Sequence, residues 1–178
     1  STAAKMATMG AWIKSNTSIS ATSSGDPIYT TGVPAAARTD GTARALSETL
    51  FKDVLQQGAS AGAEFTTAMF GPVNKQNASK FAGVATKTQT FDTSKQSAMP
   101  IIGASDVYVS DWGRLSFVFN RFQRDRDAWL LDFDFVSVGF LTPFTVEALA
   151  KTGDATNSAI IAECTLVVRN EEALGLVA

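Results

Sequence analysis

The segment 43–57 carries hydrophobic positions at intervals of three and four residues, with charged side chains on the opposite face. Its apolar positions are Ala43, Leu46, Leu50, Phe51, Val54 and Leu55. This period predicts an amphipathic helix that buries one face. We expect Asp40 or Thr42 to cap its start and Gly58 to end it.

A short apolar run follows at 65–70 and predicts a buried strand. Gly71 and Pro72 then indicate the start of a second helix, over 72–83, because proline is tolerated at the first helical position. A helix, a strand and a helix in close succession predict two helices packed on a mixed sheet.

The second half of the chain changes to strand-like patterns. Residues 106–110 and 114–119 flank a turn that contains Gly113, which predicts a β-hairpin. Further strands are predicted at 128–131, 144–149 and 159–169.

Between these strands, the segment 132–141 has a helical pattern. Asp132 can cap a helix, and Phe133, Val136 and Phe140 would share one of its faces. We therefore expect a short helix there and a mixed α+β fold for the chain. Residues 15–42 are rich in Ser, Thr, Gly, Ala and Pro, which predicts turns and a long extended loop.

The composition narrows the function. Of the 178 residues, 45% are apolar and 18% are charged, so the chain can bury a proper core. The net charge of −2 gives it no overall preference for nucleic acid or an anionic membrane. No stretch approaches the roughly 20 apolar residues that span a bilayer. The chain has no histidine, which is the usual general base of hydrolases and the commonest metal ligand.

Two residue types inform the expected core. The single cysteine, Cys164, lies in the apolar run 160–168, so we interpret it as a small buried hydrophobe. The chain has 12 phenylalanines and only 2 tyrosines, which favours a dry core over binding sites that use hydroxyl groups.

The densest group of charges lies at 120–127, beside an aromatic ring. Its candidate contact residues are Arg121, Phe122, Arg124, Asp125, Arg126 and Asp127. An arginine side chain binds a carboxylate through two hydrogen bonds in a fixed geometry. Such a cluster can therefore orient two subunits or domains relative to one another. The alternative interpretation is a solvated loop whose ion pairs contribute little.

The pairs Asp125 with Asp127 and Asp132 with Asp134 could also bind a hard cation or perform acid–base chemistry. Adjacent arginines compete for the first pair, and no glycine follows at the spacing of a calcium-binding loop. Serines and lysines are plentiful, but they form no recognisable hydrolase motif. Glycine-rich nucleotide-binding motifs are missing as well. We therefore expect no enzyme activity, no metal site, no cofactor and no small-molecule ligand.

Seven segments, in this order, resemble the C-terminal half of the major capsid proteins of tailed bacteriophages or prophages. They are AWI (11–13), RTDGT (38–42), GPVNK (71–75), IGASDVYVSD (102–111), NRFQRDRD (120–127), LAKTGD (149–154) and VRNEEALG (168–175). Each motif alone is moderately specific, but together they span nearly the whole chain. One position departs from the pattern, because Phe133 stands where the resemblance leads us to expect proline.

The resemblance implies the capsid fold shared by tailed phages and herpesviruses. That fold has an axial domain, with a central mixed sheet flanked by helices, and a peripheral domain with a long spine helix and a β arm. Residues 36–130 would form the axial core and 131–178 the strands that run to the peripheral domain and back. Residues 1–35 would be a remnant of the spine region with its connecting loop, and the N-terminal arm and most of the spine helix would precede Ser1.

The function implied is that of a shell subunit. Its partners would be copies of itself, in pentamers and hexamers, with enclosed DNA contacted only non-specifically and no membrane. The protein would reside in the virion after assembly in the bacterial cytoplasm. The alternatives are another phage structural protein, such as a tail-tube subunit, a surface binding module or, least favoured, a Ser-Lys or metal-dependent hydrolase. A tube subunit should be mostly strands with one helix, so the two helices beside 65–70 argue against it.

Overall fold

The computed structural model describes residues 6–20, 26–30, 32–36, 38–81, 107–151, 153–155 and 157–178. Its helices are α1 (Met9–Trp12), α2 (Glu48–Ala61) and α3 (Pro72–Ala78), with 3-10 turns η1 (Phe133–Phe135) and η2 (Glu171–Ala173). Its strands are β1 (Asn16–Ser18), β2 (Ile28–Thr30), β3 (Val33–Ala36), β4 (Thr67–Phe70), β5 (Val107–Ser110), β6 (Gly113–Phe119), β7 (Ala128–Leu131), β8 (Val136–Ala148), β9 (Ser158–Val168) and β10 (Leu174–Val177).

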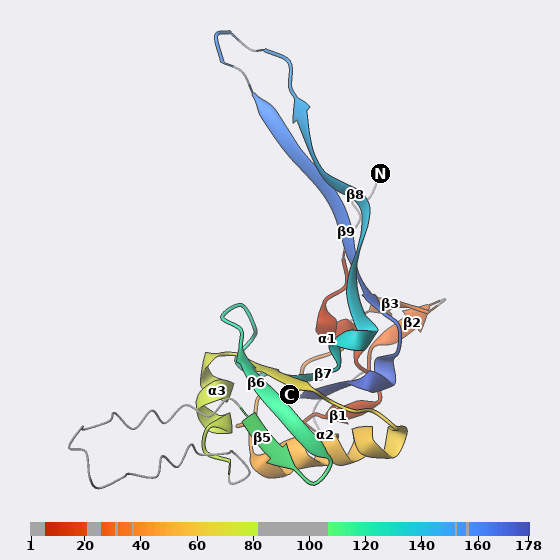
Figure 1. Cartoon of the computed structure of the whole chain (residues 1–178), viewed down its shortest axis with the longest axis vertical. Coiled ribbons are helices and arrows are strands. Elements are labelled where there is room, and N and C mark those ends of the chain that lie inside the picture. The colour runs from red at the N-terminus through yellow and green to blue at the C-terminus, as the bar shows by residue number, and fades with distance from the viewer. Residues whose placement is uncertain are drawn as a thin grey trace, which may run out of the picture.

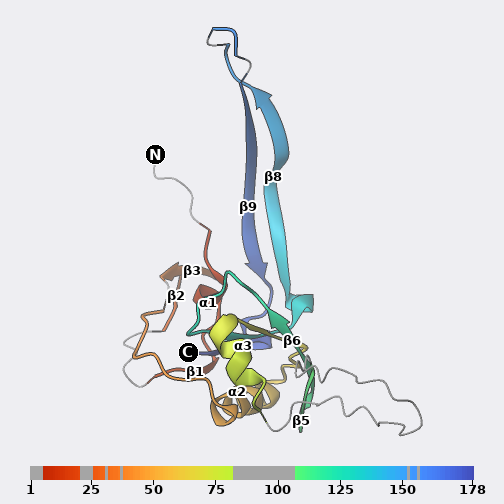
Figure 2. The same cartoon turned by 90° about the vertical axis from the view of Figure 1, so that its left-hand side faces the viewer.

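A six-stranded mixed sheet forms the body, in the order β1-β10-β7-β4-β6-β5. Strands β1 and β10 pair in parallel, as do β4 and β6, and the other neighbours are antiparallel. Strands β8 and β9 form a separate two-stranded hairpin, called the arm below, which projects far from the body (Figure 1). Seen from the side, the arm is a thin ribbon that rises from the side of the sheet (Figure 2).

The two faces of the sheet carry two hydrophobic clusters. Along β7, Ala128 and Leu130 point into the larger cluster, whereas Leu131 and Trp129 belong to the smaller one. Helix α2 covers the larger cluster, where the ring of Phe51 lies within 6.0 Å of four other aromatic rings. The segment around α1 covers the smaller cluster. The predicted strand at 128–131 is therefore confirmed as β7, and the predicted strand at 65–70 is confirmed in part, because β4 begins at Thr67. Both lie inside the sheet, with a hydrophobic cluster on each face.

Helix α2 confirms the predicted amphipathic helix but not its ends. It begins after Ser47, whose Oγ accepts a hydrogen bond from the backbone N–H of Leu50 at 3.4 Å. It continues through Gly58 to Ala61. Glycine at position 58 allows a close approach to Phe65, because a Cβ there would lie 2.2 Å from the ring. The end falls at Gly62, whose φ of 84° is the left-handed conformation that glycine tolerates.

Residues 38–46, called the strap below, are irregular because arginine side chains hold them against the body. Arg44 donates to the carbonyl of Ala178 at 3.1 Å and to Ser18 Oγ at 3.0 Å. Arg38 donates to the carbonyl of Ile13 at 2.9 Å. These contacts replace the helical start that the sequence predicted at 43.

Two other predictions need correction. The expected loop at 15–42 contains three short strands, because β1 joins the central sheet and β2 pairs with β3 across a turn. The second helix begins at Pro72 as predicted but ends at Ala78. The hairpin of β5 and β6 is confirmed over the described residues; position 106 of its prediction, and 82–83 of the helix, lie outside them.

The predicted helix at 132–141 is wrong beyond its first turn. Asp132 does cap, because its side chain accepts a hydrogen bond from the backbone N–H of Asp134, but the turn is the 3-10 helix η1. From Val136 the chain is strand β8, which pairs with β9 over almost its whole length. Val136 and Phe140 are spaced as well for alternation in a strand as for a helical face, and the long partner strand decides between them.

Candidate intersubunit surfaces

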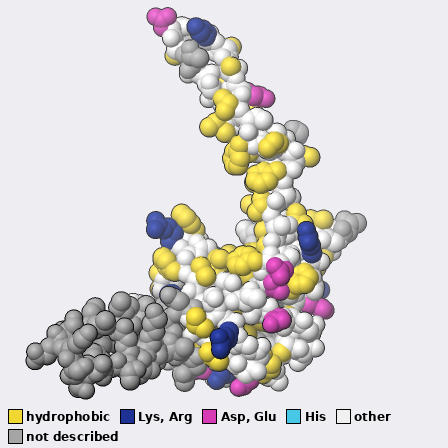
Figure 3. All heavy atoms as spheres, in the orientation of Figure 1, with side chains coloured by type: hydrophobic (Ala, Val, Ile, Leu, Met, Phe, Trp, Pro, Cys, Tyr) yellow, Lys and Arg dark blue, Asp and Glu magenta, His cyan; other side chains and the backbone are white. Residues whose placement is uncertain are grey.

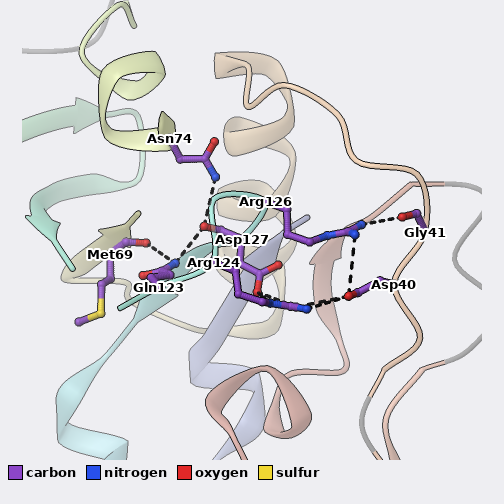
Figure 4. Close-up of polar contacts among 8 residues, drawn as sticks. All are labelled: Asp40, Gly41, Met69, Asn74, Gln123, Arg124, Arg126 and Asp127. Atoms are coloured by element: carbon purple, nitrogen blue, oxygen red, sulfur yellow. Dashed lines mark hydrogen bonds and ion pairs between the residues drawn. The ribbon is translucent and has the colours of Figure 1, made fainter. Parts of the chain in front are cut away.

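The charged segment predicted as a contact forms a tight loop between β6 and β7, and two of its arginines, Arg124 and Arg126, bind within the chain (Figure 4). Arg124 donates through Nε to Oδ2 of Asp127 at 2.8 Å and through Nη1 to Oδ2 of Asp40 at 2.7 Å. Arg126 donates through Nη2 to the carbonyl of Gly41 at 2.7 Å. These bonds join the loop to the strap, 84 residues earlier in the chain.

Gln123 fixes the other side of the loop. Its Nε2 donates to the carbonyl of Met69 at 3.0 Å and to that of Asp127 at 2.9 Å. Asn74, buried on α3, donates to the same carbonyl of Asp127 at 3.2 Å. Gly71 permits this close approach, because a Cβ there would lie 2.9 Å from the carbonyl oxygen of Gln123. The loop backbone is therefore held against both β4 and α3.

The two carboxylates that share Arg124 differ in their surroundings. The hydrogen bond from Arg124 lowers the pKa of Asp40, which lies near the surface. Burial raises the pKa of Asp127, whose side chain is only 3% exposed, although the bond from Arg124 opposes that rise. Within the described residues, no group of three or more Asp, Glu or Cys side chains could hold a metal ion. The hydrogen bonds of Arg124 and Arg126 hold the loop in a fixed position against the strap.

Phe122 stands apart from this network. Phe122 is 89% exposed. The loop that carries it is nevertheless held by hydrogen bonds, from the backbone N–H of Phe122 to Asn120 and from Gln123 to two carbonyl groups. Arg121 and Asp125 are also exposed. The predicted contact thus divides into a part bound within the chain, described above, and an exposed part centred on Phe122. That the exposed part touches another subunit stays a prediction.

The arm has two chemically different faces, which follow from its register and from the alternation of side chains along a strand. One face, called the apolar face below, carries Val136, Val138, Phe140, Val146 and Ala148 of β8 with Ile160, Ala162, Cys164, Leu166 and Val168 of β9. The opposite face is mixed and includes Thr142, whose Oγ1 donates to Oε2 of Glu163 at 3.2 Å. Phe144 lies beside Phe140, with ring centroids 6.0 Å apart.

Most of the apolar face is open to solvent in the described part of the chain. Ile160 is 73% exposed and Val146 is 71% exposed, and the ring of Phe144, which lies beside that of Phe140, is 73% exposed as well. Figure 3 shows hydrophobic side chains in groups along the length of the arm. The most exposed of them together present on the order of 500 Å² of apolar surface, as large as the largest patch on a typical monomer. The helical pattern at 132–141 did not predict this surface, because a helix there would not place these side chains on one face of a strand.

Two expectations about burial are therefore wrong. Cys164 is exposed, because it lies on the apolar face of the arm, opposite Phe140. The phenylalanines do not all serve a dry core either. Five of those described are buried, but six are exposed on the arm, at its base or around the 120–127 loop: Phe119, Phe122, Phe133, Phe135, Phe140 and Phe144. A period-two count over 136–148 and 158–168 could have found the two on the arm, Phe140 and Phe144.

An arm with one bare apolar face, together with a rigid loop that presents an exposed aromatic ring, is typical of a structural protein that joins an assembly. The comparison with protein families agrees, since the model of the SU10 major capsid protein family matches residues 1–178. The chain belongs to this family and is a structural subunit of a phage capsid. The comparison with curated proteins gives no match.

The fold is compatible with this membership. Its mixed α/β body has a central mixed sheet and few helices, as the resemblance implied. Capsid membership also places the protein in the virion. In the part of the chain that the structure describes, no helix combines the length and the hydropathy needed to cross a bilayer.

Proposed function

We propose that this capsid subunit associates with copies of itself through the apolar face of the arm and so contributes to a closed shell of pentamers and hexamers. The observation that carries the proposal is that most of that face is open to solvent, while its base, at Val136 and Val168, packs against the smaller cluster of the body. An isolated two-stranded ribbon is marginally stable in water, so an arm of this length is expected to be covered in the functional state.

The apolar surface of the arm is too small to form a stable interface by itself. A stable interface buries about 800 Å² on each partner, and the arm alone offers on the order of 500 Å² of apolar surface. The arm is therefore expected to act together with a second surface, and the loop that presents Phe122 is the proposed second one.

The finer organisation is proposed on the same basis. Residues 36–130 would be the axial core, 131–178 the strands that leave it and return, and 1–35 the remnant of the spine region. Support comes from the arm, which leaves the central sheet directly after β7. The division is not strict in space, because β1 from residues 1–35 and β10 from residues 131–178 pair within the same sheet. The enclosed DNA would be contacted only non-specifically, and assembly would take place in the bacterial cytoplasm.

Cys164 provides a native probe for this proposal. It is the only cysteine of the chain and lies in the middle of the apolar face. The reaction of its thiol with a disulfide reagent is followed as the protein concentration rises, and sedimentation velocity reports the size of the particles. We expect the thiol to become at least about tenfold less reactive in the associated species, because a buried interface core excludes water.

A matched control places the thiol on the opposite face. In the double variant Cys164→Ala/Thr165→Cys, the new cysteine lies one residue along the same strand and points to the mixed face. It should stay reactive on association. Associated particles in which Cys164 reacts as fast as in the free subunit would contradict the proposal. Protection of Cys164 in the monomer would instead show that another part of the same chain covers the face.

A further inference from the structure

A cavity of about 340 Å³ lies between the 120–127 loop, the strap, α1 and the end of β10. Its wall includes apolar side chains, among them Trp129 and Leu176, and Phe122 also lines it while remaining 89% exposed. Arg38 and Asp127 contribute charges of opposite sign. A cavity of this size lies at the lower end of the range seen for ligand-binding sites.

Most of the buried polar atoms without a hydrogen-bond partner, among the described residues, belong to side chains that line this cavity. Among the described residues, seven buried side-chain nitrogen or oxygen atoms form no hydrogen bond, and five of them belong to residues of this cavity wall. They are Nε and Nη1 of Arg38, Nε1 of Trp129, Oε1 of Gln123 and Oδ1 of Asp127. Buried polar groups in folded proteins are nearly always paired, so this concentration indicates that a polar group occupies the cavity in the functional state.

The chemistry of these atoms selects the kind of group. Arg38 and Trp129 offer N–H donors, and Gln123 and Asp127 offer oxygen acceptors. The assignment for Gln123 is fixed, because its Nε2 already donates to two carbonyl groups. A carboxylate would meet the carboxylate of Asp127, which is only 3% exposed, and a cation would meet Arg38, which is 7% exposed. A neutral group that both accepts and donates fits. Hydroxyl groups and amides do both, and an amide matches the separate donors and acceptors of the wall better, because its N–H and C=O lie on different atoms.

We propose that this cavity receives an amide group, of a side chain or of the backbone, from a second copy of the chain. The inference rests on the proposed function, because it takes the partner to be another subunit. Phe122 favours a protein partner over a small amide, because only a larger surface would cover an aromatic ring that is 89% exposed. The ring of Phe122 would be buried against the partner as an apolar anchor. The polar groups of the cavity would fix how the two subunits are aligned.

The indole N–H groups provide the test. The chain has three tryptophans, and two of them, Trp12 and Trp129, have a buried indole nitrogen without a partner. Only Trp129 of these two lines the cavity. Two-dimensional 1H–15N spectra are recorded from dilute to concentrated protein, with the resonances assigned through Trp12→Phe and Trp129→Phe. We expect the Trp129 indole resonance to move with the same concentration dependence as sedimentation, and that of Trp12 to stay in place.

Variants separate the cavity from its surroundings. Gly10→Leu should fill the cavity and abolish the movement of the Trp129 resonance, because Gly10 lines it and a Cβ there meets no atom within 4 Å. Gly10→Ala is the control, and both should unfold at the temperature of the native chain within a few degrees. Trp129→Phe and Phe122→Ser should each weaken self-association roughly five- to tenfold, because each removes one interface contact. Trp12→Phe should not weaken it.

Three outcomes would overturn the inference. Self-association with a fixed Trp129 resonance, unaffected by Gly10→Leu, would mean that the cavity holds only water, and would leave the proposed function in place. Movement of the Trp129 resonance without any change in particle size would contradict the second copy as occupant. Absence of self-association at every concentration would contradict the cavity's role and the proposed function together.

Discussion

Replacement of Gly71 by alanine should destabilise the protein by about 1.5–4 kcal/mol, because the 120–127 loop lies directly against the start of α3. A Cβ at this position would lie 2.9 Å from the carbonyl oxygen of Gln123 and 3.2 Å from that of Arg124. Both atoms are backbone carbonyl oxygens, so no side-chain rotation can relieve the contact. The loop backbone has its own hydrogen bonds, from Gln123 N–H to the carbonyl of Asn120 at 3.3 Å and from Asp127 N–H to the carbonyl of Arg124 at 3.2 Å.

The magnitude combines two effects. Forcing extra atoms into a well-packed site typically costs about 1–3 kcal/mol. Gly71 is also the N-cap of α3, and alanine is a poorer N-cap than glycine by about 0.5–1 kcal/mol. Backbone strain does not contribute, because the φ of Gly71 is −72°, which alanine adopts freely.

Urea unfolding followed by circular dichroism measures the change, and two variants separate its causes. Gly71→Ser restores a good N-cap but keeps the Cβ, so it should recover only the smaller effect. Gly10→Ala should have little effect, because its Cβ meets no atom within 4 Å. A loss below about 1 kcal/mol for Gly71→Ala, or full recovery in Gly71→Ser, would show that the loop is not pressed against α3.

Other predictions follow from single contacts. Gly58→Ala should lower the midpoint of urea unfolding, although alanine favours a helix by about 1 kcal/mol, because its Cβ would lie 2.2 Å from the ring of Phe65. A higher midpoint would refute this. Asp40 has a lowered pKa, so the stability it contributes is present above its ordinary pKa of 3.8 and lost as the pH falls. Asp40→Asn should therefore flatten the acid side of the stability profile; an unchanged profile would mean that its bond to Arg124 is not formed in solution. Asn16→Ala should cost about 1–3 kcal/mol in thermal unfolding, because its Nδ2 bonds the carbonyl of Leu174 at 3.2 Å within the buried sheet edge. A loss under about 0.5 kcal/mol would refute that contact.

Local sequence patterns determined much of the body of the protein. The period of three and four residues identified α2, the Gly71–Pro72 pair identified the start of α3, and short apolar runs identified the central strands. The order of the capsid motifs along the chain identified the family. These features are readable because they depend on neighbours within a few residues, where periodicity and capping rules apply.

The tertiary structure decided what depends on distant partners. Residues 136–141 are a strand because the long strand β9 pairs with them, and that pairing alone places Cys164 on an exposed apolar face. The charged loop is bound within the chain because Asp40 meets Arg124 across 84 residues. Such contacts leave no local signal, since side chains far apart in sequence meet only after the sheet has formed. The sequence alone thus identified α2, α3 and four strands of the central sheet, together with the class of protein. The tertiary structure added β1 and β10 to that sheet and decided which surfaces stay exposed.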